Sequence, residues 1–155
     1  MDHFFETQCE LPLAVDRIFD FFAAAENLQR ITPPELHFRI LTPGPIRIST
    51  GTRIEYALRL FGVPFQWSTL ISIWDPPRRF VDEQLRGPYA VWEHTHTFEP
   101  TASGTAMLDR VRYRLPLSPL GELAHPLVRW QINRIFAYRE RAVFRELAPL
   151  RNAQP

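Results

Sequence analysis

The sequence is poor in cysteine, lysine and long apolar runs. Its 155 residues include one cysteine, Cys9, and all 18 residues counted as Lys or Arg are arginine. A single cysteine excludes an internal disulfide and fits a reducing compartment, so we predict a cytoplasmic location. No apolar run approaches the ~20 residues that a membrane-spanning helix needs. The first residues lack a basic stretch followed by an apolar one, so we expect no secretory leader.

An excess of charge of either sign is also missing, since the formal net charge is +1. Proteins that bind nucleic acid usually carry a clear basic excess, because contacts to phosphate supply much of their affinity. Arg110, Arg112 and Arg114 share one face of a predicted strand, but no set of stacking aromatic residues accompanies them. We therefore predict a solvated outer face at these arginines and no nucleic-acid partner.

Apolar and aromatic residues are plentiful, at 45% and 13% of the chain. A chain of this length is most simply one domain, and such a domain buries roughly 70% of the surface that its unfolded chain exposes. We predict a single domain over residues 1–155, with an ordered core over about 3–147. The aromatic content is high enough for a core that also surrounds a cavity.

The hydrophobic periodicity predicts an α+β protein. A helical stripe over 14–24 and a short turn at 27–31 follow the first strand, and a long helix fills the chain after a loop at 116–121. Alternating patterns predict strands at 3–10, 36–42, 51–60, 65–74, 79–85, 90–99 and 105–115. Short connections make the last six strands an antiparallel meander, whose apolar face the C-terminal helix would cover. The inward face of 79–85 stays open, because its register depends on its turn.

The run from Trp92 to Phe98 is the most informative segment. Strict alternation places Trp92, His94, His96 and Phe98 on one face of a strand. Two imidazoles between large aromatic rings are typical of an apolar pocket wall with a few polar groups facing inward. We therefore predict a site for a small hydrophobic molecule at this strand.

The hairpin around residue 102 predicts a partner for one of these histidines. A four-residue loop, 101–104, would pair Phe98 with Met107 and His96 with Asp109, whose side chains would then lie roughly 5 Å apart. Such a pair can satisfy itself as a buried polar contact, orient a ligand, or act in general acid–base catalysis. The candidate catalytic residues are His96, Asp109 and Tyr56.

A metal site is an alternative reading of the His94-x-His96 pattern. The two residues lie roughly 6.6 Å apart along a strand, close enough for one ion to bridge them, with Asp109 as a third ligand. However, an isolated HxH pattern is common, and the aromatic neighbours favour a dry pocket. We predict no metal and no cofactor.

Arg139 interrupts the apolar stripe of the C-terminal helix. The stripe contains Val128, Ile132, Ile135, Phe136, Val143 and Leu147, and Arg139 falls near its centre. A buried guanidinium needs a partner, because it cannot lose its charge. The partner would be an inward carboxylate (Asp109, Asp82 or Glu83), water at the cavity edge, or an anionic group of a ligand.

The chain resembles the SRPBCC superfamily of helix-grip proteins, which includes START lipid-transfer domains, polyketide cyclases and the pollen-allergen fold. The segments that carry the resemblance are 12–22, 27–34, 61–65, 74–82, 87–89 and 94–98. The resemblance implies a curved sheet of about seven strands wrapped on a long C-terminal helix, with two short helices after the first strand. It also implies an apolar cavity between sheet and helix. Some similar small bacterial proteins are fused to a dehydrogenase-like domain.

These observations together predict binding, carriage or presentation of a lipid, quinone or polyketide-like molecule. The predicted ligand-binding residues are Tyr56, Trp67, Trp92, His94, His96, Asp109, Tyr113, Ile135 and Arg139. The resemblance implies a cavity mouth with Phe61, Val63 and Tyr89 as an apolar lip for transient contact with a membrane or a protein. Two alternatives remain open: a cyclase, aromatase or isomerase that uses His96, Asp109 and a tyrosine, and an accessory module that docks to a dehydrogenase-like partner.

Overall fold

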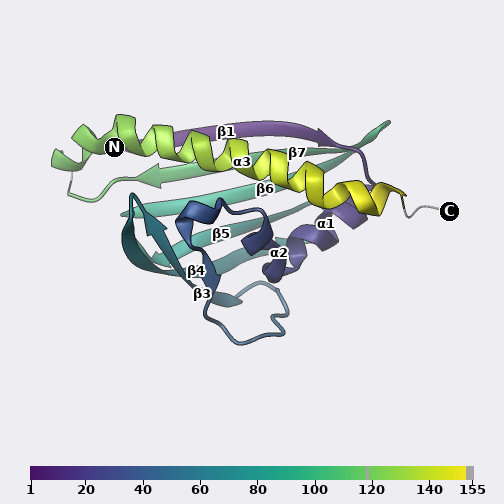
Figure 1. Ribbon diagram of the computed structural model, residues 1–155, viewed down its shortest axis with the longest axis horizontal. Helices are drawn as coiled ribbons and strands as arrows, with labels where there is room; N and C mark the ends of the chain where they lie inside the picture. Colours follow the sequence, from purple (N-terminus) through teal and green to yellow (C-terminus); the bar gives the residue numbers. More distant parts are fainter. Residues whose placement is uncertain (118, 153–155) are drawn as a thin grey trace.

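The computed structural model describes residues 1–117 and 119–152. Two short helices and a 3-10 turn separate the first strand from the rest of the sheet, and one long helix ends the chain (Figure 1). The strands are β1 (Asp2–Leu11), β2 (Arg39–Ile40), β3 (Arg53–Leu60), β4 (Val63–Asp75), β5 (Arg79–Arg86), β6 (Val91–Thr101) and β7 (Gly104–Arg114). The helices are α1 (Val15–Ala23), α2 (Ala25–Arg30), η1 (Pro34–Leu36), η2 (Leu120–Ala124) and α3 (His125–Asn152).

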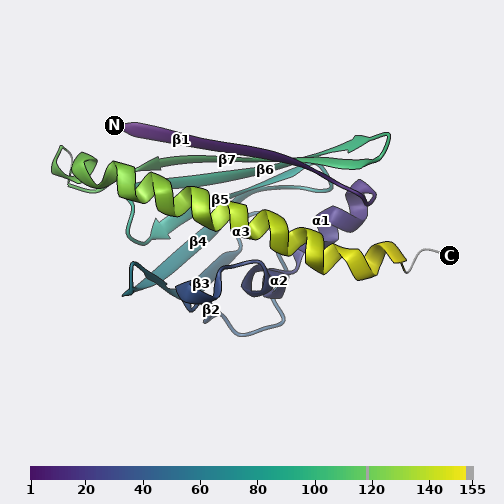
Figure 2. The ribbon, with the colours of Figure 1, turned by 45° about the horizontal axis from the view of Figure 1, so that its top comes forward.

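The seven strands form one antiparallel sheet in the order β1-β7-β6-β5-β4-β3-β2. The first strand therefore pairs with the last, and the meander from β3 to β7 follows the chain. In both Figures 1 and 2, α3 runs along the length of the molecule; in Figure 2, β1, β7 and β6 lie on one side of it and β3 and α2 on the other. The sheet thus curves around α3, and the α+β architecture predicted from the sequence is confirmed.

Apolar side chains on α3 close the concave face of the sheet. Ile132 and Phe136 pack with Val111 and Tyr113 of β7, which are all buried. Further along the helix, buried apolar residues of α3 join α1 and the inner faces of β6 and β7; they are Ala142, Val143 and Leu147. This packing is the stripe predicted from the helical spacing, and it fixes α3 across the sheet.

The connection between β3 and β4 is a tight two-residue turn. Phe61 and Gly62 both have positive φ, 52° and 79°, which matches the turn type whose twist suits an antiparallel hairpin. A bulky residue rarely adopts this conformation, and the Phe61 side chain is 49% exposed. The turn geometry therefore holds an aromatic ring at the surface.

The prediction of a strand over 36–42 is largely wrong. Pro33 and Pro34 fix backbone angles that begin the 3-10 turn η1, and His37 after it has a left-handed φ of 45°. Only Arg39 and Ile40 then pair with β3. The loop expected over 116–121 also differs at its end, because the 3-10 turn η2 begins at Leu120 and the long helix starts only at His125. Among the described residues, no helix is long and apolar enough to cross a membrane.

Candidate functional site

A cavity of about 170 Å³ lies between the concave sheet and the helices. Its walls are mainly apolar and come from α1, α2, β3, β4 and α3; they include Phe22, Leu28, Ile54, Tyr56, Trp67 and Ile135. The charged or titratable groups that reach it from the opposite wall and from α3 are Asp82, His94, His96 and Arg139. A mostly apolar hollow with a few convergent polar groups is the usual composition of a small-molecule site.

The two histidines reach the cavity because of the alternation along β6. The residues at 94, 96 and 98 point inward and are buried, while their neighbours are half-exposed or exposed. The register of the β6–β7 hairpin pairs His96 with Asp109 and Phe98 with Met107, as the loop length predicts. Phe80 of β5 stacks on His96, with ring centroids 4.1 Å apart, and so holds that imidazole against the wall.

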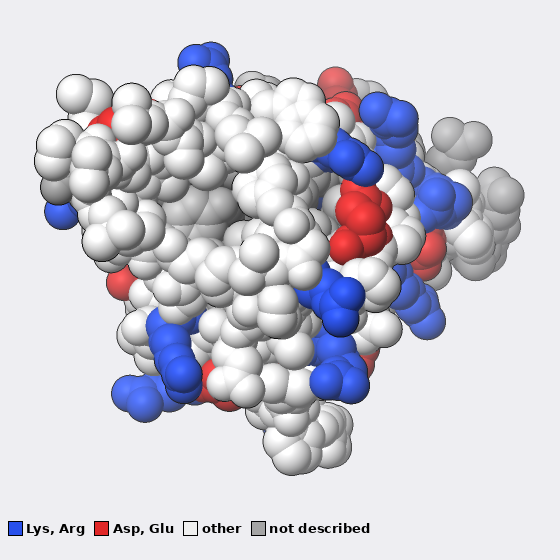
Figure 3. All heavy atoms as spheres, turned by 60° about the vertical axis from the view of Figure 1, so that its left-hand side comes forward, with Lys and Arg blue, Asp and Glu red and all other residues white. Residues whose placement is uncertain are grey.

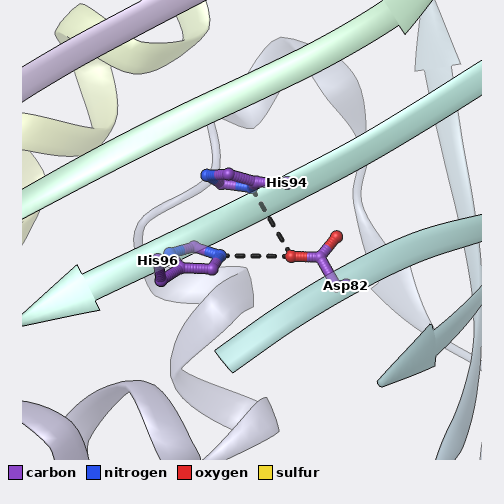
Figure 4. A group of neighbouring side chains, drawn as sticks. All are labelled: Asp82, His94 and His96. Atoms are coloured by element: carbon purple, nitrogen blue, oxygen red, sulfur yellow. Dashed lines mark hydrogen bonds and ion pairs between the residues drawn. The ribbon is translucent and has the colours of Figure 1, made fainter. Parts of the chain in front are cut away.

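Two carboxylates and two imidazoles form one cluster, which we call the His–Asp quartet (Asp82, His94, His96 and Asp109); all are buried except Asp82, which is half-buried. His94 Nε2 lies 2.8 Å from Asp109 Oδ1 in a hydrogen bond, and its Nδ1 lies 3.5 Å from Asp82 Oδ2. His96 Nε2 lies 3.1 Å from the same Asp82 oxygen. His96 Nδ1 lies 2.8 Å from Asp109 Oδ1, but its direction makes no hydrogen bond. Each carboxylate therefore faces both imidazoles, as Figure 4 shows for Asp82.

The electrostatic environment differs between the two histidines. Burial lowers the pKa of His94, because an imidazolium there loses hydration, and the neighbouring His96 adds to the lowering. Burial also acts to lower the pKa of His96, but the carboxylates of Asp109 and Asp82 outweigh it, so that pKa is raised.

Both carboxylates of the quartet stay ionised at neutral pH. Burial alone would raise the pKa of each, but the imidazoles hold the pKa of Asp109 far below its usual range. The two imidazoles and Arg139 likewise keep the pKa of Asp82 below its ordinary value. The quartet at the cavity wall thus carries two carboxylate charges, which the imidazoles and Arg139 offset.

Arg139 brings a positive charge into the cavity from α3. Its Nε atom is buried and has no hydrogen-bond partner among the described residues. Its guanidinium carbon lies 5.1 Å from the ring centre of Phe136. The ion pairs of α3 use other side chains, Arg134 with Glu35 and Glu146 with Arg30. The inward placement expected from the helical stripe is therefore accompanied by an unsatisfied donor.

The other residues predicted for the pocket divide into two groups. Trp92 and Ile135 line the cavity together with Tyr56 and Trp67. Tyr113 does not line it, because its ring is buried against α3 and its hydroxyl lies 3.2 Å from Nε2 of His125. Asp109 also lies behind the cavity wall, where it contacts the histidines from the side of β7.

The three residues predicted for the entrance differ in exposure. Phe61 and Val63 are 49% and 53% exposed at the β3–β4 turn. Tyr89 instead packs inward, with its ring 4.8 Å from that of Trp92 and 5.7 Å from that of Trp67. The loop after β5 therefore contributes to the aromatic cluster and does not hold Tyr89 out as a lip.

Asp82 is the residue of the site that the sequence did not single out for the pocket. It pairs with His94 across the β5–β6 ladder, and Phe80 pairs with His96. Register shifts in the β4–β5 ladder interrupt simple alternation, so the inward face of β5 could not be read from its own pattern. Pairing with the histidine-bearing strand is the signal that would have identified it.

Figure 3 views the molecule from the end where α3 begins. This face is mostly uncharged and is hollowed, with charged groups gathered toward its lower and right-hand edges. Strongly exposed apolar side chains of η2 and α3 are Leu120, Leu123, Leu127 and Trp130. The structure therefore exposes an apolar surface on η2 and early α3, besides the β3–β4 turn.

Comparison with known proteins supports the architecture. A family model described as "Domain of unknown function (DUF8410)" matches residues 36–147. No curated protein matches the chain.

Solved structures with the same fold share little sequence with it. A START superfamily protein from Mycobacterium smegmatis is 14% identical over 96% of this chain and 99% of its own, with a TM-score of 0.73. Major latex-like protein 151 from Panax ginseng is 10% identical over 96% and 99%, with a TM-score of 0.67. Ara h 8.0201 is 15% identical over 92% and 99%, with a TM-score of 0.63. The chain therefore belongs to the DUF8410 family and has the helix-grip fold.

Proposed function

We propose that the protein binds a hydrophobic or amphipathic small molecule in the cavity under α3, in order to carry or present it. The observation that carries this proposal is the buried Nε of Arg139, which has no hydrogen-bond partner in the described part of the chain and lies at a mainly apolar hollow. A buried donor without a partner costs free energy, and an acidic or carbonyl group on a ligand would recover it. The aromatic walls would hold the apolar part of the same molecule.

The size of the cavity limits the part of the ligand that it encloses. Its 170 Å³ slightly exceeds the ~150 Å³ of an apolar cavity known to admit benzene. The enclosed part would therefore be about one ring or a short chain, and a longer lipid, quinone or polyketide-like molecule would extend through the opening. Helix-grip neighbours of the START type support this class of ligand only as an analogy of fold.

Native mass spectrometry of freshly purified protein tests whether a molecule is bound at all. Titration of 4-phenylbutyrate and its amide then tests the anchor, with tryptophan fluorescence as the readout because Trp67 and Trp92 line the cavity. Arg139→Met should weaken the acid about tenfold or more and the amide much less, since a charged hydrogen bond contributes about 1.5–3 kcal/mol. Arg145→Met, an exposed change on the same helix, is the matched control. Equal losses for acid and amide in Arg139→Met would reject the anchor.

The quartet supports a second candidate, a cyclase- or isomerase-type enzyme. His96 reaches the cavity between two carboxylates, and Tyr56 lines the same hollow. Burial raises the pKa of Tyr56 well above its usual value, which suits a hydrogen-bond donor better than a base. His96→Gln distinguishes the candidates: an enzyme would lose turnover while keeping its ligand, whereas a carrier would change only in affinity.

A further inference from the structure

Three side chains of the quartet direct one donor atom each toward a common point at the cavity wall (Figure 4). The atoms are Nδ1 of His94, Nε2 of His96 and Oδ2 of Asp82, and all lie within 4.8 Å of one another. The Asp82 oxygen is 3.5 Å from the first nitrogen and 3.1 Å from the second. A tetrahedral zinc ion with bonds of 2.0–2.1 Å separates its ligand atoms by about 3.3 Å. The two separations from the Asp82 oxygen lie just above and just below that value.

A neutral imidazole ring cannot donate to both carboxylates of this arrangement. Each ring has a carboxylate oxygen near both of its nitrogens, Asp82 on one side and Asp109 on the other. A neutral imidazole carries a single N–H, so it can donate to only one of these carboxylates. If His94 donates to Asp109, its other nitrogen presents a lone pair to the Asp82 oxygen, and two acceptors face each other. A metal ion between them would replace this repulsion by coordination.

Asp109 has the position that an orienting carboxylate takes in metal sites. It lies behind both histidines and receives a 2.8 Å hydrogen bond from His94. Histidines that ligate a metal usually donate their second N–H to a carboxylate or carbonyl, which fixes the ring and its tautomer. The ion pairs of Asp109 in the described part of the chain involve the same two histidines and no arginine.

The fourth side of the site faces the cavity. Asp82, His94 and His96 all line the hollow, whereas Asp109 does not. Three protein ligands with one open position are typical of zinc sites that hold water or a substrate. Imidazole and carboxylate ligands also suit other first-row divalent ions.

We propose that Asp82, His94 and His96 bind a divalent transition-metal ion, with zinc as the type case, and that Asp109 orients the two imidazoles. The sequence disfavoured a metal because an isolated HxH pattern is common and its aromatic neighbours favour a dry pocket; it offered Asp109 as the third ligand and left the inward face of β5 open. The structure supplies Asp82 in its place. This site does not depend on the proposed ligand carriage, since the ion would bind in the absence of any organic molecule.

The test is a titration of the chelator-treated full chain with Co²⁺, followed by competition with Zn²⁺. We expect one Co²⁺ per chain, with visible absorption bands typical of low coordination, and their loss on adding Zn²⁺. Asp82→Asn should weaken binding at least as much as the orienting variant Asp109→Asn, for which a loss of about 10–100-fold is expected. His3→Gln is the matched control, because His3 belongs to a separate His–Glu contact with Glu122; it should leave binding unchanged.

Circular dichroism and urea unfolding of the metal-free variants show whether each still folds. If Asp82→Asn does not fold, the wild type alone decides, because Zn²⁺ that binds the native state must raise its urea midpoint. Absence of stoichiometric binding and of that shift in the wild type would overturn the proposal. Equal affinity of wild type and folded Asp82→Asn would do so too.

Discussion

The two faces of the β6–β7 hairpin use the same chemistry in opposite environments. On the outer face, Arg112 pairs with Glu93 at 2.8 Å and with Asp2 at 3.2 Å, and these side chains are 28–36% exposed. On the inner face, His94 and Asp109 lie 2.8 Å apart with side chains 5% and 9% exposed. The distances are alike, so the main difference between the faces is exposure to solvent.

Solvent decides what each set of pairs can do. Exposed ion pairs contribute about 0–1 kcal/mol, because water and salt screen them. Buried pairs carry a desolvation cost, and removing one partner leaves the other uncompensated. The outer pairs therefore give solubility and modest support, whereas the inner quartet holds strong fields next to a cavity. That is the condition under which binding or catalytic groups gain their effect.

The largest expected contrast concerns thiol reactivity on β1, where Cys9 faces inward. Burial, with smaller contributions from Asp109 and Glu140, raises the pKa of Cys9 to about 12 from an ordinary 9.0. The reactive thiolate should therefore be about a thousandfold scarcer below pH 9 than in unfolded chain. We expect iodoacetamide to alkylate the native protein far more slowly than the urea-unfolded protein, with the rate rising as pH rises.

The double variant Gln8→Cys with Cys9→Ser is the control, because it moves the only thiol to the exposed neighbouring position. It should react at nearly the same rate folded and unfolded. A native Cys9 that reacts as quickly as this outer thiol would mean that the inner face is open to solvent.

Removal of the inner carboxylate should give the next largest effect. Asp109→Ala leaves two buried imidazoles with a single carboxylate, and breaking such a contact typically costs about 3 kcal/mol. Urea unfolding with a chelator present measures the loss in the free energy of unfolding. A loss below about 1 kcal/mol would show that the quartet is no more coupled than a surface pair.

The smallest effect is expected on the outer face. Glu93→Ala removes the carboxylate opposite Arg112 on the neighbouring strand, and we expect its unfolding free energy to change by less than about 1 kcal/mol. The difference from wild type should shrink further at high salt. A loss as large as that of Asp109→Ala, or one that salt does not reduce, would contradict the comparison.

Much of the fold could be predicted from the sequence, because local periodicity survives folding. The alternation at His94, His96 and Phe98 and the loop length of the hairpin predict the observed pairing of His96 with Asp109. The stripe on the C-terminal helix predicts its buried face. The prediction of a strand over 36–42 was largely wrong, because Pro33 and Pro34 fix backbone angles that begin a 3-10 turn just before it.

The membership of the site was less predictable, because contacts across strands depend on register. Asp82 joins the histidines through the β5–β6 ladder, next to a strand pair with two register shifts. Tyr113 has the predicted inward orientation, but it lies against α3 instead of at the cavity. The direction in which a side chain points could be predicted from the sequence, whereas its distance from the cavity could not.

The sequence by itself determined the layers of this protein: an antiparallel sheet, the helix that covers it, and an inward face with two imidazoles and an arginine. It did so because side-chain direction follows from periods of 2 and 3.6 residues along a single element. Only the tertiary structure decided that Asp82 joins the two imidazoles opposite Asp109, and that Nε of Arg139 has no hydrogen-bond partner among the described residues. Those facts depend on how strands with bulges curve around a helix, which brings together residues that no local pattern relates.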